Sequence, residues 1–196
     1  MMDKNYMFIR GARIAKQLEE FLAEDSTYAD LERNTLNNMP GENRSAATNS
    51  VQIRNLELIP YEGALGVNST VNSINSGNSY QPQMMFLNVN YVNMEDNPEV
   101  ENDPTLVTFQ AADGKDYTIE PIHLSRNNVK VRCTCLDFRW RFAIYNDRDN
   151  SLFGDGPGLY QNKTDRQPNN PQRVPGVCKH LLKLAAELKV NGVVQP

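Results

Sequence analysis

All three cysteines of this 196-residue chain stand in two short pairs that constrain how it can fold. The first pair is Cys133-x-Cys135, and Cys178-x-His180 follows after 42 intervening residues, 136–177. Thiolate and imidazole are the ligands that tetrahedral Zn²⁺ prefers in proteins. The pattern therefore predicts one zinc ion bound by Cys133, Cys135, Cys178 and His180, with two distant segments brought together around it.

Four protein ligands fill a tetrahedral shell and leave no place for a water or a substrate, so the predicted zinc is structural. The alternative is that the three cysteines are free thiols packed as small apolar side chains. An odd number of cysteines argues against a disulfide framework and favours a reducing compartment. The second histidine, His123, is either a hydrogen-bond partner of the site or an ordinary surface or core residue.

The residues around the first pair alternate as in a β-strand, which predicts a strand over 128–135 with both thiols on one face. Beyond it, aromatic and basic residues alternate on an expected continuation of that strand. They are either a core stripe with solvated arginines or a surface for phosphates and bases. The aromatic residues are Phe138, Trp140 and Phe142, and the arginines are Arg139 and Arg141.

The second pair leads into a predicted helix in which Leu181, Leu184 and Leu188 share one face, ended by Asn191-Gly192. The segment from about 147 to 176 contains four of the eleven prolines of the chain. This segment predicts a long loop inserted between the two halves of the metal site.

Helical patterns dominate the N-terminal part, with one predicted helix over 8–24 and a weaker one over 28–36. Strands are expected over 51–59 and 84–92, and a hairpin over 105–122 that turns at Asp113-Gly114. The Asn-, Ser- and Gly-rich residues 64–83 predict an exposed excursion or a surface hairpin. The acidic residues 95–103 predict a linker.

These elements predict an α+β protein in three parts. Residues 1–40 are an N-terminal helical arm, 41–104 an irregular β-rich extension, and 105–196 a ββα zinc-binding unit with the long loop insertion. The arm packs either on its own domain or on a neighbouring molecule.

Charge is distributed unevenly along the chain. Residues 1–122 carry 8 Lys/Arg against 18 Asp/Glu, whereas residues 123–196 carry 12 against 6. Either the C-terminal part binds an acidic partner, such as nucleic acid or an acidic protein face, or the two parts face each other. No apolar run approaches the roughly 20 residues of a membrane helix, so no membrane partner is expected.

The Cys-x-Cys and Cys-x-His pairs, with a strand before them and a helix after, resemble the SWIM-type zinc finger found in Mutator-like transposases. The resemblance covers about residues 128–190, and Asp137-Phe138 matches the Cys-x-Cys-x-Asp-aromatic run of that family. The gap between the pairs is longer than in most members. The resemblance implies a module that binds nucleic acid or a protein partner.

A second resemblance concerns the runs CLDFRWRFAIYNDRDNSLFG and PNNPQRVPGVCKHLLKL. They are similar to segments of predicted virion structural proteins of large tailed bacteriophages. This resemblance implies a non-enzymatic protein, made in the host cytoplasm and located in the virion, whose partners are other virion proteins or copies of itself. The sequence has no phosphate-binding loop, nucleophile elbow or HExxH motif that would indicate an enzyme.

Overall fold

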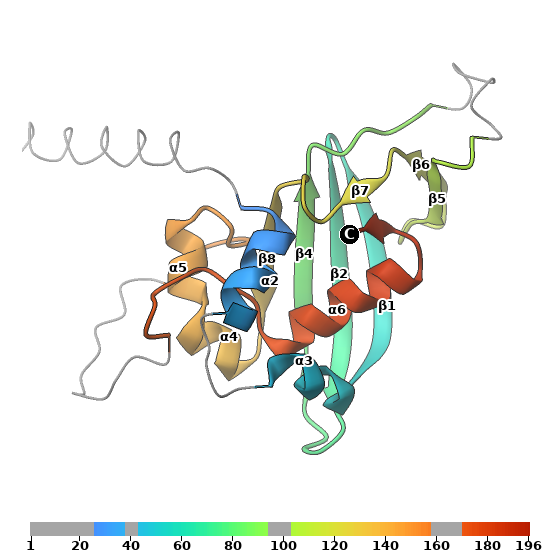
Figure 1. The fold of residues 1–196 in the computed structure, drawn as a ribbon. Coiled ribbons are helices and arrows are strands. Elements are labelled where there is room, and N and C mark those ends of the chain that lie inside the picture. Colours follow the sequence, from blue (N-terminus) through green and yellow to red (C-terminus); the bar gives the residue numbers. More distant parts are fainter. Residues whose placement is uncertain (1–25, 38–42, 94–102, 158–169) are drawn as a thin grey trace, which may run out of the picture.

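The computed structural model describes residues 26–37, 43–93, 103–157 and 170–196. In this part of the chain a twisted antiparallel sheet carries helices on one face (Figure 1). The strands are β1 (Val51–Tyr61), β2 (Ala64–Ser73), β3 (Ser79–Tyr80), β4 (Pro82–Leu87), β5 (Val107–Gln110), β6 (Asp116–Ile119), β7 (Ile122–His123), β8 (Val129–Cys133) and β9 (Val194–Gln195). The helices are α2 (Tyr28–Asn37), α3 (Arg44–Ala47), the 3₁₀ turn η1 (Thr48–Ser50), α4 (Leu136–Arg141), α5 (Ala143–Arg148) and α6 (Lys179–Val190).

The main sheet has the strand order β1-β2-β4-β8, and the short β3 pairs with β2. β1, β2, β3 and β4 precede residue 104, the end of the predicted β-rich extension, whereas β8 follows it. β8 is an edge strand that is covered on its outer side, because Leu152 pairs with Val131 and the backbone N–H of Val129 donates to Ser26. The strand that carries Cys133 is therefore paired on both sides.

The prediction that residues 64–83 form an exposed excursion is wrong for most of that segment. β2 lies in the interior of the sheet, where Leu65, Val67 and Val71 are fully buried. The apolar Leu65, Val67 and Val71 alternate with small or polar residues, and the backbone of β2 pairs with β1 on one side and with β3 and β4 on the other. The predicted alternative, a hairpin, is present where β2 turns back into β3, and the turn around Ile74–Asn78 is exposed as expected.

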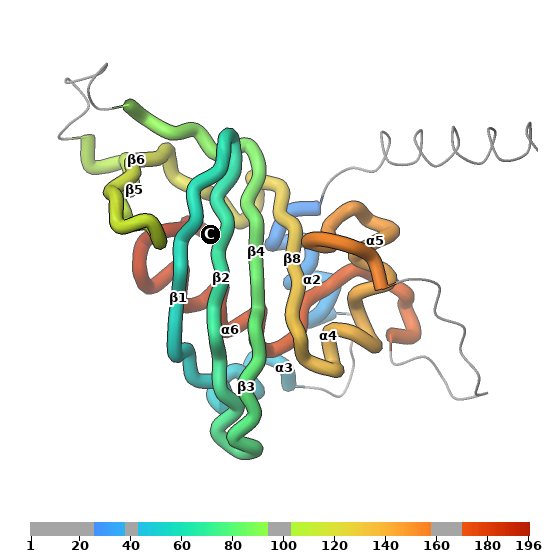
Figure 2. The backbone as a smooth tube through the Cα atoms, turned by 180° about the vertical axis from the view of Figure 1, so that it is seen from behind, coloured from blue at the N-terminus to red at the C-terminus, as the bar shows by residue number. Residues whose placement is uncertain are grey.

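Helix α6 contacts β1, β4 and β8 along one face of the sheet, as Figure 1 shows. Its leucines at positions 181, 184 and 188 are all fully buried, as the sequence pattern predicted. α2 adds the buried Tyr28 and Leu31 to the same core. Seen from behind in Figure 2, the opposite face of the sheet carries no helix of the described residues.

The predicted mixed α+β class, with a sheet-rich middle and a C-terminal helix, is confirmed. The helix over 28–36 and the hairpin over 105–122 are present as α2 and as β5–β6, and Gly114 adopts φ +80° in the turn. The predicted helix over 8–24 and nearly all of the predicted acidic linker lie outside the described residues.

The predicted strand continuation after the first cysteine pair is wrong, because residues 136–141 form helix α4. Phe138 and Phe142 are buried, four residues apart as on one face of a helix, whereas Trp140 is 47% exposed. Alternation of aromatic and basic residues favours a strand, but Phe138 and Phe142 also have the i, i+4 spacing of a helix, and Cys135 caps that helix.

The predicted insertion over 147–176 is anchored at the two ends that the structure describes. Leu152 pairs with β8, and the side-chain amide of Asn170 donates to the carbonyls of Arg141 and Val174. No helix in the described part of the chain is long and apolar enough to cross a membrane.

Candidate metal centre

The four predicted ligands come from two places where a helix begins. Cys133 ends β8, and Cys135 is the N-cap residue of α4. Cys178 is the N-cap residue of α6, and His180 lies in the first turn of that helix. All four residues are buried, and one donor atom from each lies within 4.8 Å of the other three. The structure therefore brings together all four residues, which could hold a metal ion.

The distances between donors suit a tetrahedral ion. Nδ1 of His180 lies 3.7 Å from Sγ of Cys133 and 3.9 Å from Sγ of Cys178. Zn–S bonds of about 2.3 Å and a Zn–N bond of about 2.0 Å at tetrahedral angles imply roughly 3.5 Å between sulfur and nitrogen. These two separations exceed that value by only a few tenths of an ångström.

The turn after β8 positions the second thiol. The strand ends at Cys133, and Cys135 lies beyond it with extended backbone angles, φ −71° and ψ 149°. The Cys135 sulfur accepts a hydrogen bond from the backbone N–H of Phe138 at 3.3 Å. Helix α4 thus begins at a cysteine cap, and the buried Phe138 holds its first turn against the core.

The loop that leads to Cys178 is held by two buried polar side chains. Asn146 of α5 donates to the carbonyl of Gly176 at 3.1 Å and accepts from its N–H at 2.8 Å. The hydroxyl of Thr35 of α2 accepts from the N–H of Val177 at 2.8 Å. A Cβ added at Gly176 would lie 2.6 Å from the Thr35 hydroxyl oxygen, so the close approach requires glycine there.

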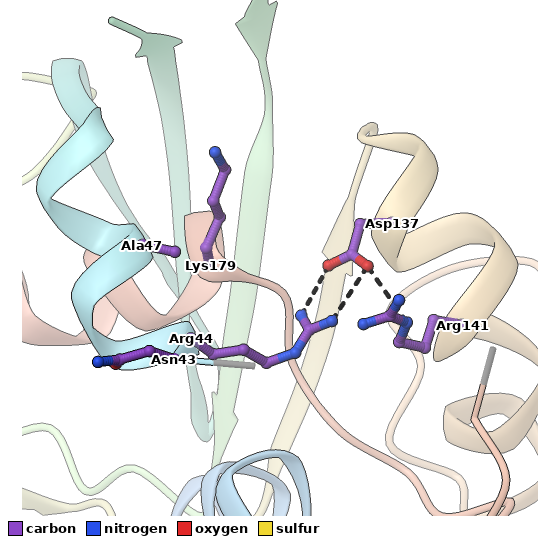
Figure 3. A pocket seen from close by; sticks show the side chains of 6 residues that line it. All are labelled: Asn43, Arg44, Ala47, Asp137, Arg141 and Lys179. Carbon is purple, nitrogen blue, oxygen red and sulfur yellow. Dashed lines mark hydrogen bonds and ion pairs between the residues drawn. The ribbon is translucent and has the colours of Figure 1, made fainter. Parts of the chain in front are cut away.

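Asp137, two residues after Cys135, ties α4 to the segment before the sheet. Its carboxylate accepts from both terminal nitrogens of Arg44, at 2.8 and 3.3 Å, and lies 3.4 Å from Nε of Arg141. The Arg44 side chain is only 6% exposed. A bidentate pair whose arginine is buried fixes the start of α4 relative to α3 (Figure 3).

Tyr80 of β3 covers the histidine of the cluster. The two rings stack with their centroids 4.5 Å apart and an angle of 30° between the planes. Nε2 of His180 is buried and has no hydrogen-bond partner among the described residues. Packing against the Tyr80 ring, rather than a hydrogen bond at Nε2, therefore orients the imidazole of His180.

The thiols of the cluster influence one another's protonation. Burial raises the pKa of Cys178, while hydrogen bonds from the neighbouring thiols lower the pKa of Cys135. A hydrogen bond to Cys135 raises the pKa of Cys133. Because zinc binds thiolates, an ion that binds all three sulfurs must displace their protons.

Sequence patterns indicated the four cluster residues but missed Thr35, Tyr80, Arg44 and Asn146, which support them. No local signal marks these four, because their hydrogen-bond or ring partners lie far away along the chain. Arg44 and Asp137 are 93 positions apart, and Thr35 and Val177 are 142 apart. His123, considered as a partner of the site, lies on β7 and is not part of the cluster.

The fold and the site define a mixed α+β protein with a buried Cys₃His cluster that could hold a metal ion. Comparison with known protein families, with curated proteins and with solved structures found no match.

Proposed function

We propose that the protein binds one structural zinc ion through Cys133, Cys135, Cys178 and His180. The observation that carries this proposal is the closed, buried set of three sulfurs and one ring nitrogen. Among common protein metals, this donor set favours zinc, and four protein ligands leave no position for a substrate. The ion joins the end of β8 to the start of α6 and so works as a cross-link.

We further propose that the cross-linked unit is a non-enzymatic structural component of a tailed-phage virion. Support comes from the two sequence runs that resemble such proteins and that contain three of the four ligands, Cys135, Cys178 and His180. A structural zinc site contributes ~10 kcal/mol or more of folding free energy, which suits a protein assembled without disulfides.

Helix α4 presents a surface that suits contact with a neighbouring subunit. Leu136 is 65% exposed and Trp140 is 47% exposed, four positions apart along α4 and close to the ligand Cys135. Aromatic side chains on a rigid element often anchor protein interfaces. A neighbouring subunit that contacts α4 would therefore lie next to the end of β8 where the zinc is proposed to bind.

Two measurements test the two levels of this proposal. Native mass spectrometry of the recombinant full chain would report the bound metal and the number of copies, and we expect one zinc per chain. Proteomic analysis of purified phage particles encoded by the same genome would detect the chain in stoichiometric amounts. Its absence from particles, with capsid and tail proteins present, would refute the virion role and leave the zinc proposal intact.

A nucleic-acid-binding module is the second candidate, because Trp140 is exposed instead of buried in the core. The guanidinium of Arg139 lies 4.9 Å from the centre of the Trp140 ring, which places a cation beside an accessible aromatic face. Bases stack on such rings while arginines contact phosphates. Salt-dependent binding of single-stranded DNA or RNA that is lost in Trp140→Ala and Arg139→Gln would favour this function over subunit contact.

A further inference from the structure

The face of the main sheet opposite helix α6 carries a polar pocket of about 300 Å³. Figure 2 views this face, and no helix of the described residues covers it. Asparagine, glutamine, serine, threonine and glutamate residues of β1, β2 and the N-terminal end of β4 line the pocket. Among the described residues, this lining contains no lysine, arginine or apolar side chain and none of the four cluster residues.

Strand pairing fixes the positions of the lining side chains. Glu57 of β1, Asn68 of β2 and Gln83 of β4 stand opposite one another across the three strands. The residues next to them along each strand are packed in the core, and side chains alternate between the two faces of a sheet. These three side chains therefore share the open face. Asn55 and Thr70 form the next pair on the same face, so the sheet presents polar groups in two adjacent rows.

A β-bulge lies at the edge of the pocket. The register of β1 on β2 shifts between Ile53 and Asn55, and Arg54 has no partner across the strand pair. Bulges occur preferentially next to functional sites, where they re-aim a side chain. The hydroxyl of Ser69 donates to the carbonyl of Asn55 at 2.7 Å, which fixes the backbone directly after the bulge. The side chain of Asn55 thus joins the pocket lining from a fixed position.

The protein itself uses only part of the hydrogen-bonding capacity of the pocket. Gln83 donates to the amide oxygen of Asn68 at 3.0 Å, and Asn55 donates to one carboxylate oxygen of Glu57 at 2.8 Å. Within the part of the chain that the structure describes, the Asn68 amide nitrogen and the Gln83 amide oxygen keep no partner. The Thr70 hydroxyl has none there either. Donors and acceptors therefore remain available side by side.

The ring of Tyr61 extends the site along the same face. A Cβ added at Gly66 would lie 2.7 Å from Cε2 of Tyr61, so the ring lies across this glycine. Gly66 precedes Asn68 by two residues, which is about 7 Å along β2. The Tyr61 side chain is 47% exposed. An accessible aromatic surface thus lies beside the polar pocket.

We propose that this face of the sheet binds a neutral saccharide. Sugar hydroxyls both donate and accept hydrogen bonds, which matches the mixed donors and acceptors of the amides and of Thr70. The face of an aromatic ring is electron-rich, so the C–H groups on one side of a sugar ring can lie on Tyr61. The volume lies at the lower end of the range of small-molecule sites, about 300–1,000 Å³. The proposal depends on neither the zinc ion nor the virion role.

The charges of the lining disfavour two other ligand classes. Phosphate sites use arginine or lysine, and the pocket lining has neither. Arg132 stands opposite Gln83 on β8, but its guanidinium donates to the carbonyls of Phe153 and Asp155. Glu57 is the single carboxylate of the lining, whereas a calcium ion takes six to eight oxygen ligands. A neutral polyhydroxyl compound is the ligand class that remains.

NMR titration of the ¹⁵N-labelled full chain tests the proposal. The probes are D-glucose, D-galactose, D-mannose and N-acetyl-D-glucosamine, and tetraethylene glycol is the control compound without ring hydroxyl groups. The variants are Asn68→Ala, Tyr61→Ala and Thr70→Val, and Thr70→Val keeps a β-branched side chain in the strand. The matched control is Asn72→Ala, which removes the same amide from the same face of β2 outside the pocket lining. Thermal unfolding of each variant confirms that it is folded.

We expect at least one of the four sugars to shift the side-chain amide signals of Asn68 and Gln83 saturably. Stacking on Tyr61 should also move C–H signals of that sugar upfield. Affinity should fall about tenfold in each pocket variant and stay unchanged in Asn72→Ala.

Three results would overturn the saccharide site. The first is the absence of saturable shifts with all four sugars. The second is an equal response to tetraethylene glycol, or equal sugar binding by the folded pocket variants and the wild type. The third is a set of shifts on this face that follows protein concentration instead of sugar concentration, because a second copy of the chain would then cover it.

Discussion

The sheet layer and the metal corner of this protein are held together by different kinds of contact. In the sheet layer, defined as β1, β2, β4 and the apolar side of α6, buried aliphatic side chains such as Leu65, Val67 and Leu184 meet. In the metal corner, defined as the end of β8, α4, α5 and the first turn of α6, buried aromatic side chains such as Phe138 and Phe142 are joined by specific polar contacts. They are the Cys₃His cluster, the Arg44–Asp137 pair and the Asn146–Gly176 hydrogen bonds.

The difference shows how each region can fail. Apolar contacts are numerous and individually modest, so loss of one leucine lowers stability without changing the arrangement of the rest. The corner instead depends on a few specific partners, each of which leaves a buried polar group behind when its partner is removed. Substitutions in the two regions should therefore separate metal binding from global stability.

The largest effect is expected from removing the metal or a ligand. Cys178→Ser replaces a fully buried sulfur of the cluster. We expect loss of bound zinc and a decrease of several kcal/mol in unfolding free energy, since a structural zinc supplies ~10 kcal/mol or more. Chelator titration followed by near-UV circular dichroism measures this. Unchanged stability in the variant would argue against a structural ion.

A matched substitution in the sheet layer is Leu184→Ala. The side chain is fully buried, so the cavity should cost about 2–5 kcal/mol in urea unfolding. Zinc stoichiometry should stay at one per chain, because Leu184 lies outside the cluster. A loss of zinc in this variant would mean that the two regions do not differ as described here.

Asn146→Ala tests the polar support of the corner. The substitution leaves the N–H and the carbonyl of Gly176 buried without their partner, which should cost about 2–3 kcal/mol. Because Gly176 lies two residues before Cys178, zinc should also exchange faster with a competing chelator. Stopped-flow transfer of zinc to a colorimetric chelator would measure the rate, with Leu184→Ala as the control of similar stability.

The smallest effect is expected at the start of α2, outside both regions. Asp30 and Thr27 hydrogen-bond each other, with their oxygens 2.6 Å apart, and these bonds lower the pKa of Asp30. A lowered pKa in the folded state means that the stabilisation is full above the unfolded pKa of about 4 and is lost as the pH falls through the folded value. Asp30→Asn should therefore cost less than about 1 kcal/mol at pH 7 and nothing near pH 2.

Sequence patterns predicted much of the sheet layer. Leu181, Leu184 and Leu188 of α6 recur at helical spacing, and outside this layer Asp113-Gly114 marks the turn of the β5–β6 hairpin, because those signals are local. β2 was missed as an interior strand because four of its ten residues are asparagine or serine. What places it inside is pairing on both sides with β1 and β4, which no local pattern records.

In the metal corner, only the four cluster residues could be predicted from the sequence. Cysteine and histidine carry a chemical signal of their own, so the four cluster residues were recognised from their spacing. Arg44, Thr35 and Asn146 look like ordinary polar residues in the sequence, and their roles come from partners that folding brings near. Helix α4 was also not predicted, because the cap at Cys135 depends on where strand β8 ends.

X-ray absorption spectroscopy at the zinc edge tests the central claim most directly, because it reports the donor atoms of the bound ion. For the full chain purified with one equivalent of zinc, we predict three sulfur neighbours at about 2.3 Å and one nitrogen neighbour at about 2.0 Å. A shell dominated by oxygen, or a folded protein that retains no zinc after desalting, would contradict the account.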